Sequence, residues 1–335
     1  MKILAPVRSL DEVEMLAESG AEEFYCGITP AEWQQKYTGM FWISRRSPNG
    51  GGMQSTGDLR ALTEAAHQRG IPVFVTLNAP MYTGQQTADV AALARALDEE
   101  AGVDAFIIGD LRVLIELSRM KLRAALHVSS IMAALNTEAI RFLMDFGPRR
   151  VIFPRSVTLA EMTAIARDLR GEIELEAFVL NEGCAFEEGF CSTTHHHSVG
   201  AFCTNLSEMR VRYESEAGEQ LSPHQTWKIE HNHARYRDYV WYLNGNGCST
   251  TAAGLPYGPC GLCAVHELAS IGIDSLKIVG REQGAFRKMA SVKMVADIAR
   301  RVRSGADRLV TIQRARSLRN EPQHCDAGYM CYYRG

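Results

Sequence analysis

Short apolar runs alternate with amphipathic stretches along most of the chain. Eight apolar runs predict strands, at Lys2–Val7, Glu23–Gly27, Ile71–Asn78, Ala105–Asp110, Ala124–Ser129, Arg150–Pro154, Ile173–Leu180 and Ser275–Val279. The stretches between and after them predict helices, which start at Ser9 and Asn136 and span Thr56–Arg69, Ala88–Glu100, Leu111–Met120, Thr158–Leu169, His266–Ile271 and Ala285–Arg303. Ser9 with Glu12 has the spacing of a capping box, and glycines such as Gly20 and Gly147 close several helices.

Eight successive strand–helix steps predict an α/β fold with a parallel sheet covered by helices. Eight repeats favour a closed (β/α)8 TIM-type barrel over an open, Rossmann-like sheet. No Gly-x-Gly-x-x-Gly motif follows the first predicted strand, which disfavours a dinucleotide-binding sheet. With 335 residues, 46% of them hydrophobic, the chain is long enough to form one large core.

Two connections are too long for a plain barrel. Ile28–Ser55 follows the second strand and contains Arg45 and Arg46, and Ser192–Pro259 lies between strands seven and eight. Both leave the carboxyl ends of strands, where barrel enzymes bind substrate, so we expect lids or binding elements. The second insertion contains Tyr239-Val240-Trp241-Tyr242, which predicts a strand of a small subdomain. The predicted divisions are 1–191 for strands one to seven, 192–259 for the insertion, 260–310 for the last strand and helix, and 311–335 for a cysteine-containing tail.

Charge and hydropathy narrow the choice of environment. The chain has 36 basic and 39 acidic residues, a formal net charge of −3, so nucleic acid is an open but disfavoured partner. No apolar run approaches the roughly 18–20 residues that span a bilayer, and no signal peptide is visible. We therefore expect a cytoplasmic protein without a membrane partner.

The nine cysteines are unevenly placed. Only Cys26 lies in the first 183 residues, and the other eight fall between Cys184 and Cys331. In a chain of this size and predicted location, such clustering indicates metal or redox chemistry rather than a disulfide framework. The cysteines form three groups: Cys184-x6-Cys191-x11-Cys203, Cys260-x2-Cys263 and Cys325-x5-Cys331.

The first two groups flank strands seven and eight, which are neighbours in a barrel, so they are expected to meet. Four thiolates suit a [4Fe-4S] cluster or zinc. The wide spacing of Cys184, Cys191 and Cys203 looks less like a zinc ribbon, and spacing alone favours iron–sulfur only slightly. The run His195-His196-His197 is better explained as a solvated loop, because alternate side chains of an extended strand face opposite ways.

Polar side chains near the carboxyl ends of the strands are the candidates for chemistry: His127, Arg155, Glu176, Lys277 and Arg281. Each has an ordinary structural explanation, such as a buried core histidine or a surface ion pair. Together they predict a polar pocket with a cationic side. Arg155 and Arg281 suit a carboxylate or a phosphate, because a guanidinium grips either one with two hydrogen bonds.

Several motifs resemble the collagenase-like peptidase family U32, whose catalytic type is unassigned. The segment Glu176-Ala177-Phe178-Val179-Leu180-Asn181-Glu182-Gly183-Cys184, followed by Gly189-Phe190-Cys191-Ser192, is similar to its signature. Further matches are His127-Val128-Ser129-Ser130 with Asn136, and Ser275-Leu276-Lys277-Ile278-Val279-Gly280-Arg281. The resemblance covers nearly the whole chain, from Leu4 to Arg281.

The resemblance implies a peptidase by name, but also oxygen-independent hydroxylases that carry a [4Fe-4S] cluster on four cysteines. Some such members modify tRNA or ribosomal RNA bases, with prephenate implicated as the oxygen source, and a paired set acts in anaerobic ubiquinone synthesis. By position, the resemblance implies Cys184, Cys191 and Cys203 as ligands, with Cys263 or Cys260 as the fourth.

Three features depart from the family pattern. Arg155-Ser156 stands where Arg-Glu is usual, Cys260 and Cys263 stand where one cysteine is expected, and Cys325 and Cys331 are additional. The extra thiols leave open an alternative fourth ligand, a second cluster or redox partners. A specialised subfamily is therefore expected.

These observations predict an iron–sulfur barrel enzyme that carries out oxygen-independent hydroxylation, or a related redox modification, of a small organic or nucleobase-like substrate. His127 and Glu176 are the candidate acid–base groups, and Arg155, Lys277 and Arg281 would hold an anionic substrate or co-substrate. An electron donor is implied, and a partner of the same family is open. The alternatives are a peptidase, with a cysteine nucleophile and His127, and a cluster-bearing accessory subunit. The substrate and the oligomeric state are left open.

Overall fold

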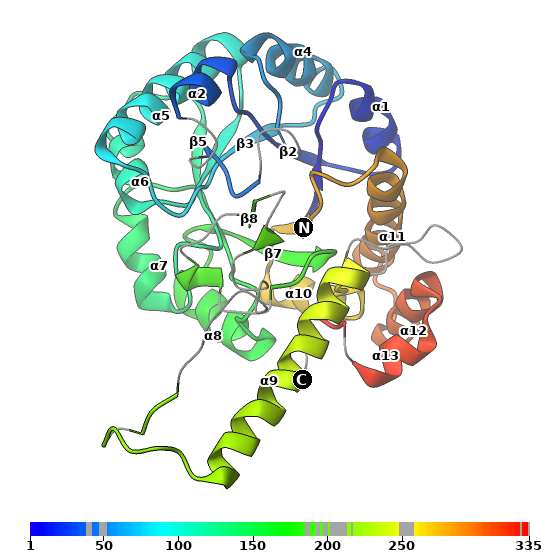
Figure 1. Cartoon of the computed structure of the whole chain (residues 1–335). Helices are drawn as coiled ribbons and strands as arrows, with labels where there is room; N and C mark the ends of the chain where they lie inside the picture. Colours follow the sequence, from blue (N-terminus) through cyan, green and yellow to red (C-terminus); the bar gives the residue numbers. More distant parts are fainter. Residues whose placement is uncertain are drawn as a thin grey trace.

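The structure is a computed structural model, and it describes residues 1–37, 42–46, 52–184, 188–191, 195–196, 200–201, 213–215, 217–247, 258–328 and 330–333. The fold is a closed parallel barrel of eight strands (Figure 1). Its strands are β1 (Lys2–Pro6), β2 (Glu23–Gly27), β3 (Val73–Leu77), β4 (Ala105–Ile108), β5 (Ala125–Val128), β6 (Arg150–Ile152), β7 (Glu174–Leu180) and β10 (Ser275–Ile278). Strands β7 and β10 pair directly, so the predicted TIM-type barrel and the adjacency of its last two strands are confirmed.

Helices surround the barrel and follow its strands in turn (Figure 1). They are α1 (Asp11–Glu18), α4 (Thr56–His67), α5 (Gly84–Ala96), α6 (Leu111–Ser118), α7 (Thr137–Met144), α8 (Leu159–Leu169), α10 (Val265–Ile271) and α11 (Ala285–Arg303). The short α2 (Ala31–Lys36) lies in the first long connection, and α12 (Arg308–Arg319) and α13 (Pro322–Ala327) follow α11. The predicted boundary at residue 310 therefore falls inside a helix.

The strand registers place the inward-facing side chains in layers of four, drawn from alternate strands, as barrel closure requires. The lower layer, toward the amino ends of the strands, contains Glu23, Ala105, Arg150 and Ser275. The middle layer contains Leu4, Phe74, His127 and Glu176. The upper layer contains Tyr25, Ile107, Ile152 and Lys277. Three of the five predicted catalytic residues thus lie inside the barrel.

The main apolar core lies between the barrel and its helices. Phe24, Phe106 and Val179 face outward from the strands and are fully buried against helical residues such as Leu16 and Leu62. Because both faces of each strand are covered, the strands read as continuous apolar runs, which is why their positions were predictable.

Two local predictions were wrong. Tyr239–Tyr242 is not a strand but the last part of α9 (Pro223–Gly247). Ser222 begins that helix by accepting a hydrogen bond from the Gln225 amide at 3.3 Å, and no glycine or proline interrupts the turns that follow until residue 245. Ser9 does not cap α1, because Glu12 turns into the core toward Lys288.

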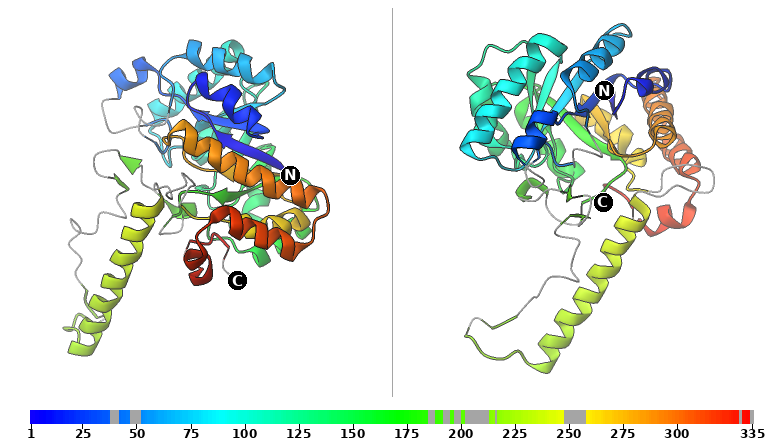
Figure 2. Two further views of the ribbon diagram at one scale, coloured as in Figure 1. Left: turned by 90° about the vertical axis from the view of Figure 1, so that its right-hand side faces the viewer. Right: turned by 45° about the horizontal axis from the view of Figure 1, so that its top comes forward.

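The histidine run also differs from the prediction. His195 and His196 form the two-residue strand β8 (His195–His196), paired with β9 (Gly200–Ala201), and His197 lies outside the described residues. His231 and His233 lie on α9. Figure 2 shows α9 standing away from the barrel.

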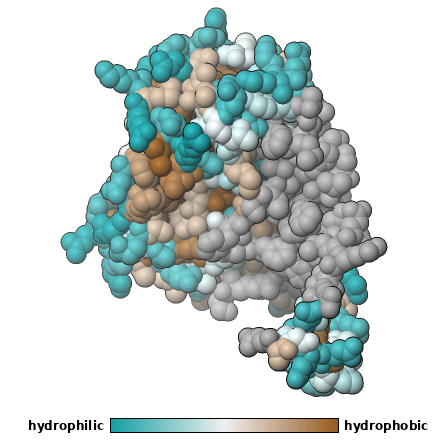
Figure 3. All heavy atoms as spheres, turned by 60° about the vertical axis from the view of Figure 1, so that its left-hand side comes forward, coloured by the Kyte–Doolittle hydropathy of each residue, from teal (hydrophilic) through white to brown (hydrophobic). Residues whose placement is uncertain are grey.

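One outer face of the molecule is mostly hydrophilic around a smaller apolar area (Figure 3). Among the described residues, none of the helices combines the length and apolar character needed to cross a bilayer. The predicted cellular compartment stays a prediction.

Candidate functional site

A buried ion network fills the lower and middle parts of the barrel. Arg150 donates to both oxygens of Glu23, at 2.8 and 2.9 Å, and to Glu176 at 3.0 Å. Ser275 donates to Glu23 at 2.7 Å, and the more exposed Glu174 also accepts from Arg150. The charges lie away from water, so each depends on its partners to offset the cost of burial.

Glu176 is fully buried and both of its oxygens are engaged. Arg150 binds one of them, and the ammonium of Lys277 binds the other at 2.7 Å. With each oxygen bound to a different cation, the carboxylate bridges Arg150 and Lys277. The structure therefore gives Glu176 the role of anchoring Lys277.

Lys277 points toward the upper end of the barrel interior. Its ammonium lies 4.3 Å from the centre of the Tyr25 ring, and burial, opposed by the contact with Glu176, lowers the pKa of Lys277. The Tyr25 hydroxyl donates to the carbonyl of Ile278 at 3.0 Å. This layer forms the floor beneath the carboxyl ends of the strands.

His127 lies in the middle layer, 2% exposed, with its ring edge against Phe74 at 4.7 Å between ring centres. In the part of the chain that the structure describes, its buried Nδ1 atom has no hydrogen-bond partner. Burial, and then the charges of Arg150 and Lys277, hold the pKa of His127 well below its usual range. The imidazole is therefore neutral at pH 7 and sits below the floor rather than in the mouth.

Arg281 occupies the mouth of the barrel, at its carboxyl end. Its guanidinium donates to the hydroxyls of Thr76 at 2.5 Å and Ser44 at 3.4 Å. It is only 6% exposed, and in the part of the chain that the structure describes it forms no salt bridge. Burial, and to a lesser degree the nearby charge of Arg46, lowers the pKa of Arg281. A buried guanidinium held only by hydroxyls is well suited to receive an anion.

Arg155 is held differently, by a carboxylate that the sequence did not single out. Glu188, 1% exposed, pairs with the Arg155 side chain and accepts from its backbone amide at 2.8 Å. The same carboxylate lies 3.9 Å from Arg45. The Arg155 guanidinium also stacks on Phe178 at 3.8 Å. Glu188 thus supplies the carboxylate beside Arg155 that Ser156 does not provide. In the sequence, only its position just before Gly189-x-Cys191 could have indicated that Glu188 belongs to the site.

Cys184 and Cys191 lie in this cationic region after β7. Both are half-buried, and Arg45 donates to the Cys191 sulfur at 3.2 Å. Cys184 lies near enough to Arg155 to affect its ionisation electrostatically. Cys203, the third predicted ligand, falls outside the described residues. Cys26 is in the barrel wall, where burial raises its pKa to about 12.

Cys260 and Cys263 lie with the two cysteines of the terminal segment. The backbones of Cys260 and Cys331 are paired in a parallel β-bridge. Cys263 lies close enough to Cys325 and Cys331 for their charges to affect its pKa. The sequence had paired Cys260 or Cys263 with the first group of thiols. Nothing in the spacing alone indicated the association with the terminal pair.

The terminal segment covers part of the barrel mouth. The Tyr332 hydroxyl donates to the carbonyls of Asn181 and Glu182, and its ring stacks on Phe178 at 6.3 Å. The Tyr333 hydroxyl donates to the Phe178 carbonyl at 2.6 Å. Both tyrosines are therefore part of the wall of the site.

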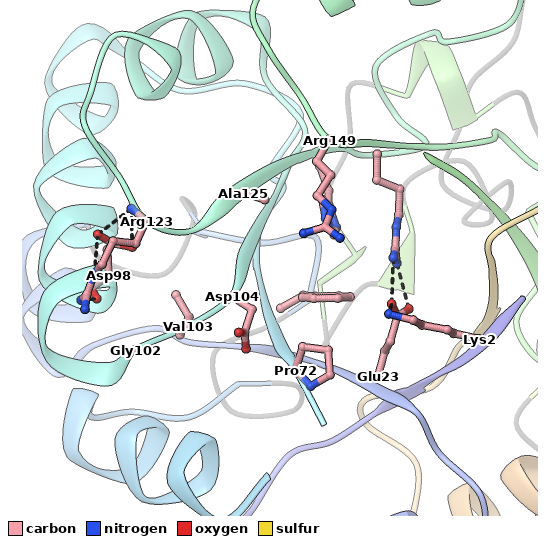
Figure 4. A pocket seen from close by; sticks show the side chains of 13 residues that line it. Lys2, Glu23, Pro72, Asp98, Gly102, Val103, Asp104, Arg123, Ala125 and Arg149 are labelled. Carbon is pink, nitrogen blue, oxygen red and sulfur yellow. Dashed lines mark hydrogen bonds and ion pairs between the residues drawn. The ribbon is translucent and has the colours of Figure 1, made fainter. Parts of the chain in front are cut away.

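A pocket of about 340 Å³ opens at the opposite end of the barrel, at the amino ends of the strands. Figure 4 shows Lys2, Glu23 and Arg149 around it, together with the Asp98–Arg123 pair. Its innermost charged groups, Glu23 and Arg150, bind one another. The amino end of a barrel is normally the stabilising end, so this pocket is not the candidate active site.

Comparison with known proteins gives one family and several distant relatives. The model of Peptidase family U32 matches residues 8–335. The chain is 25% identical to the tRNA hydroxylation protein P2 of Bacillus subtilis over 68% of this chain and 67% of that protein. It is 22% identical to tRNA hydroxylation protein P1 of the same organism, over 89% of this chain and 61% of that one. A collagenase of Porphyromonas gingivalis is 22% identical over 60% of this chain and 46% of its own length. The chain thus spans about half to two thirds of these relatives.

Proposed function

The chain belongs to peptidase family U32, and from this starting point we propose that it is an iron–sulfur barrel enzyme that hydroxylates a nucleobase of an RNA without molecular oxygen. The observation that carries the proposal is the mouth of the barrel, where two half-buried thiols lie beside the half-buried Arg45 and Arg155. The names of the two tRNA hydroxylation relatives support RNA as the substrate class.

The residues that would hold the cluster are Cys184, Cys191 and Cys203. The two described thiols fit this role, because Arg45 and Arg155 beside them would offset the negative charge of a thiolate-bound cluster. The fourth ligand is not expected among the cysteines that gather around Cys331. Apart from Cys26 in the barrel wall, Cys248 is the one cysteine left, and we propose it as the fourth ligand. A cluster bound by four cysteines supplies electron transfer.

The chain's own residues would bind and orient an anionic, oxygen-bearing co-substrate. Arg281 is the receiving group, because its guanidinium is buried and its hydrogen-bond partners among the described residues are the hydroxyls of Thr76 and Ser44. Lys277 adds positive charge from the layer below, and Glu176 fixes its position. Tyr332 narrows the mouth and limits the access of water.

Peptide hydrolysis is less well supported, although one relative is named a collagenase. The predicted base, His127, is buried in the middle layer, and among the described residues it makes no hydrogen bond to a thiol. An accessory role is the other alternative, since the tRNA hydroxylation relatives are named as a P1 and P2 pair.

The decisive experiment combines anaerobic purification with nucleoside analysis. We expect about four iron and four sulfide per chain, lost in Cys184→Ala and Cys191→Ala. RNA from anaerobic cells that express the wild type should contain a nucleoside with one additional oxygen atom, absent with Cys184→Ala and with Arg281→Gln. Full iron loading without any modified nucleoside, unless a second family member is added, would favour the accessory role. Peptide cleavage by an iron-free protein would overturn the proposal.

A further inference from the structure

Two cysteine pairs that are distant in sequence meet beside the barrel mouth. Cys260 and Cys263 flank Gly261 at the start of the short 3-10 helix η4 (Leu262–Ala264). Cys325 lies in α13, and Cys331 follows three residues after Gly328 ends that helix in the left-handed conformation. All four are half-buried, and none forms a disulfide. They are not part of the site described above.

Backbone pairing holds the two pairs together. Residues 259–261 lie against the end of β7, where Asn181 donates to the Pro259 carbonyl and Gly261 donates to Val179, both at 2.7 Å. On the other side, Cys260 donates to the Met330 carbonyl at 2.7 Å and Tyr332 donates back to Cys260 at 3.0 Å. Isolated β-bridges thus link Cys260 to Leu180 of β7 on one side and to Cys331 on the other, which places the backbones of Cys260 and Cys331 side by side.

The four thiols also share one electrostatic environment. Burial, and then the charges of Cys260, Cys325 and Cys331, raise the pKa of Cys263 to about 12. Arg316 and Arg319 act in the opposite direction on Cys325. Half-buried thiols beside two arginines form an arrangement that a soft cation would stabilise as thiolates, because the cation displaces their protons and offsets the negative charge that then develops.

We propose that these four thiols form a second metal site that binds one zinc ion: Cys260, Cys263, Cys325 and Cys331. The backbones of neighbouring strands lie about 4.8 Å apart. Tetrahedral zinc with bonds of about 2.3 Å holds its sulfur ligands about 3.8 Å apart. Cysteine side chains on neighbouring strands can reach this separation. An iron–sulfur cube holds its cysteines further apart. Among the described residues, no group of three ligand side chains is already positioned to hold a metal ion. Binding of zinc therefore requires the cysteine side chains to rotate to other rotamers.

Zinc at this position fixes the terminal segment to the barrel. Tyr332 and Tyr333 follow Cys331 directly, and their hydroxyls bind the carbonyls of Asn181, Glu182 and Phe178. Asn181 and Glu182 stand just before Cys184. Loss of the metal is therefore expected to loosen the wall of the mouth without removing the ligands of the proposed cluster.

The test measures both metals in the same preparations of the full chain, purified anaerobically under reducing conditions. We expect about one zinc per chain, and we expect Cys263→Ala and Cys331→Ala each to lose at least half of it while keeping their iron. Cys184→Ala should behave in the opposite way, losing iron and keeping zinc. Cys26→Ala is the control and should keep both. Cobalt(II) added to the metal-depleted wild type should give the intense sulfur-to-cobalt absorption of a tetrahedral thiolate site.

Any of the following four results would contradict the proposed zinc site. No zinc in the wild type, together with no thiolate–cobalt absorption, overturns the proposal without recourse to variants. Zinc retained by both variants does the same. Loss of iron in Cys331→Ala would show that these thiols bind an iron–sulfur cluster and not zinc. A Cys260–Cys331 disulfide in the reduced preparation, detected by peptide mass spectrometry, would show that they bind no metal. The iron readout keeps failure of this site separate from failure of the proposed function.

Discussion

The imidazole of His127 is placed where protonation is unfavourable. Burial, together with Arg150 and Lys277, holds its pKa well below the value of about 6.5 that it has in the unfolded chain. As the pH falls through 6.5, the imidazole binds a proton in the unfolded state but not in the folded state. The free energy of unfolding therefore decreases below that pH. Between pH 6.5 and 5 one such group lowers the free energy of unfolding by at most about 1.7 kcal/mol. We expect His127→Gln to remove this part of the pH dependence, measured by urea unfolding at each pH. Phe74→Leu disturbs the same packing but keeps the imidazole, and an equally flat profile there would contradict the assignment.

Glu176 differs from the other buried carboxylates because Lys277 depends on it. Arg150 keeps Glu23 and Glu174 if Glu176 is neutralised, whereas Lys277 loses the only carboxylate with which it forms a salt bridge among the described residues. Breaking one side of a buried pair costs about 3–5 kcal/mol, so Glu176→Gln should lower the free energy of unfolding by about that amount. Glu174→Gln, at a half-exposed position, is the matched control and should cost less than about 1 kcal/mol. Equal losses in urea unfolding would show that the position of Lys277 does not depend on Glu176.

At the scale of elements, periodicity predicted the barrel well. The bounds of β2 and α11 coincide with those expected, because each strand is buried on both faces and each helix has its own start and stop signals. The site was less predictable. His127, Glu176 and Lys277 were expected in one polar centre and do lie in the barrel, but their partners come from other strands. Glu188 lies in a three-residue 3-10 helix and Tyr332 in an irregular segment, both too short to show periodicity, and only tertiary packing brings them to Arg155 and Phe178.

The terminal segment packs on the barrel only because Gly261 lacks a side chain. A Cβ atom there would lie 3.0 Å from the Tyr333 ring, while its backbone is in a conformation open to any residue. We therefore expect Gly261→Ala to push the segment off, and hydrogen–deuterium exchange in residues 322–333 should become at least about tenfold faster. Gly57→Ala adds a Cβ atom at an ordinary 3.8 Å and is the control. Unchanged exchange in the Gly261 variant would mean that Tyr333 adjusts its ring freely.

The whole molecule has little net charge to attract RNA, so the positive charge in the mouth has to act locally. The formal charge is −3, while Arg45, Arg155 and Arg281 are concentrated at one end of the barrel. Binding a long nucleic acid requires contacts outside this small opening as well. Helix α9 stands away from the barrel (Figure 2) and offers such a surface.

The exposed side of α9 has a feature that suits a nucleobase. Trp227 is 58% exposed, and the rings of His224 and His231 lie nearly parallel to it, at 6.2 and 5.1 Å between ring centres. Stacking of a base on such a ring contributes about 1–3 kcal/mol, so Trp227→Ala should weaken tRNA binding about fivefold or more in anaerobic filter-binding assays at fixed salt. The unfolding midpoint should stay unchanged, because the ring supports no core packing. Trp33→Phe, inside the fold, is the converse control and should lower stability but not affinity. If Trp227→Ala instead keeps its full affinity, the RNA does not bind along this side of α9, and the helix serves another partner.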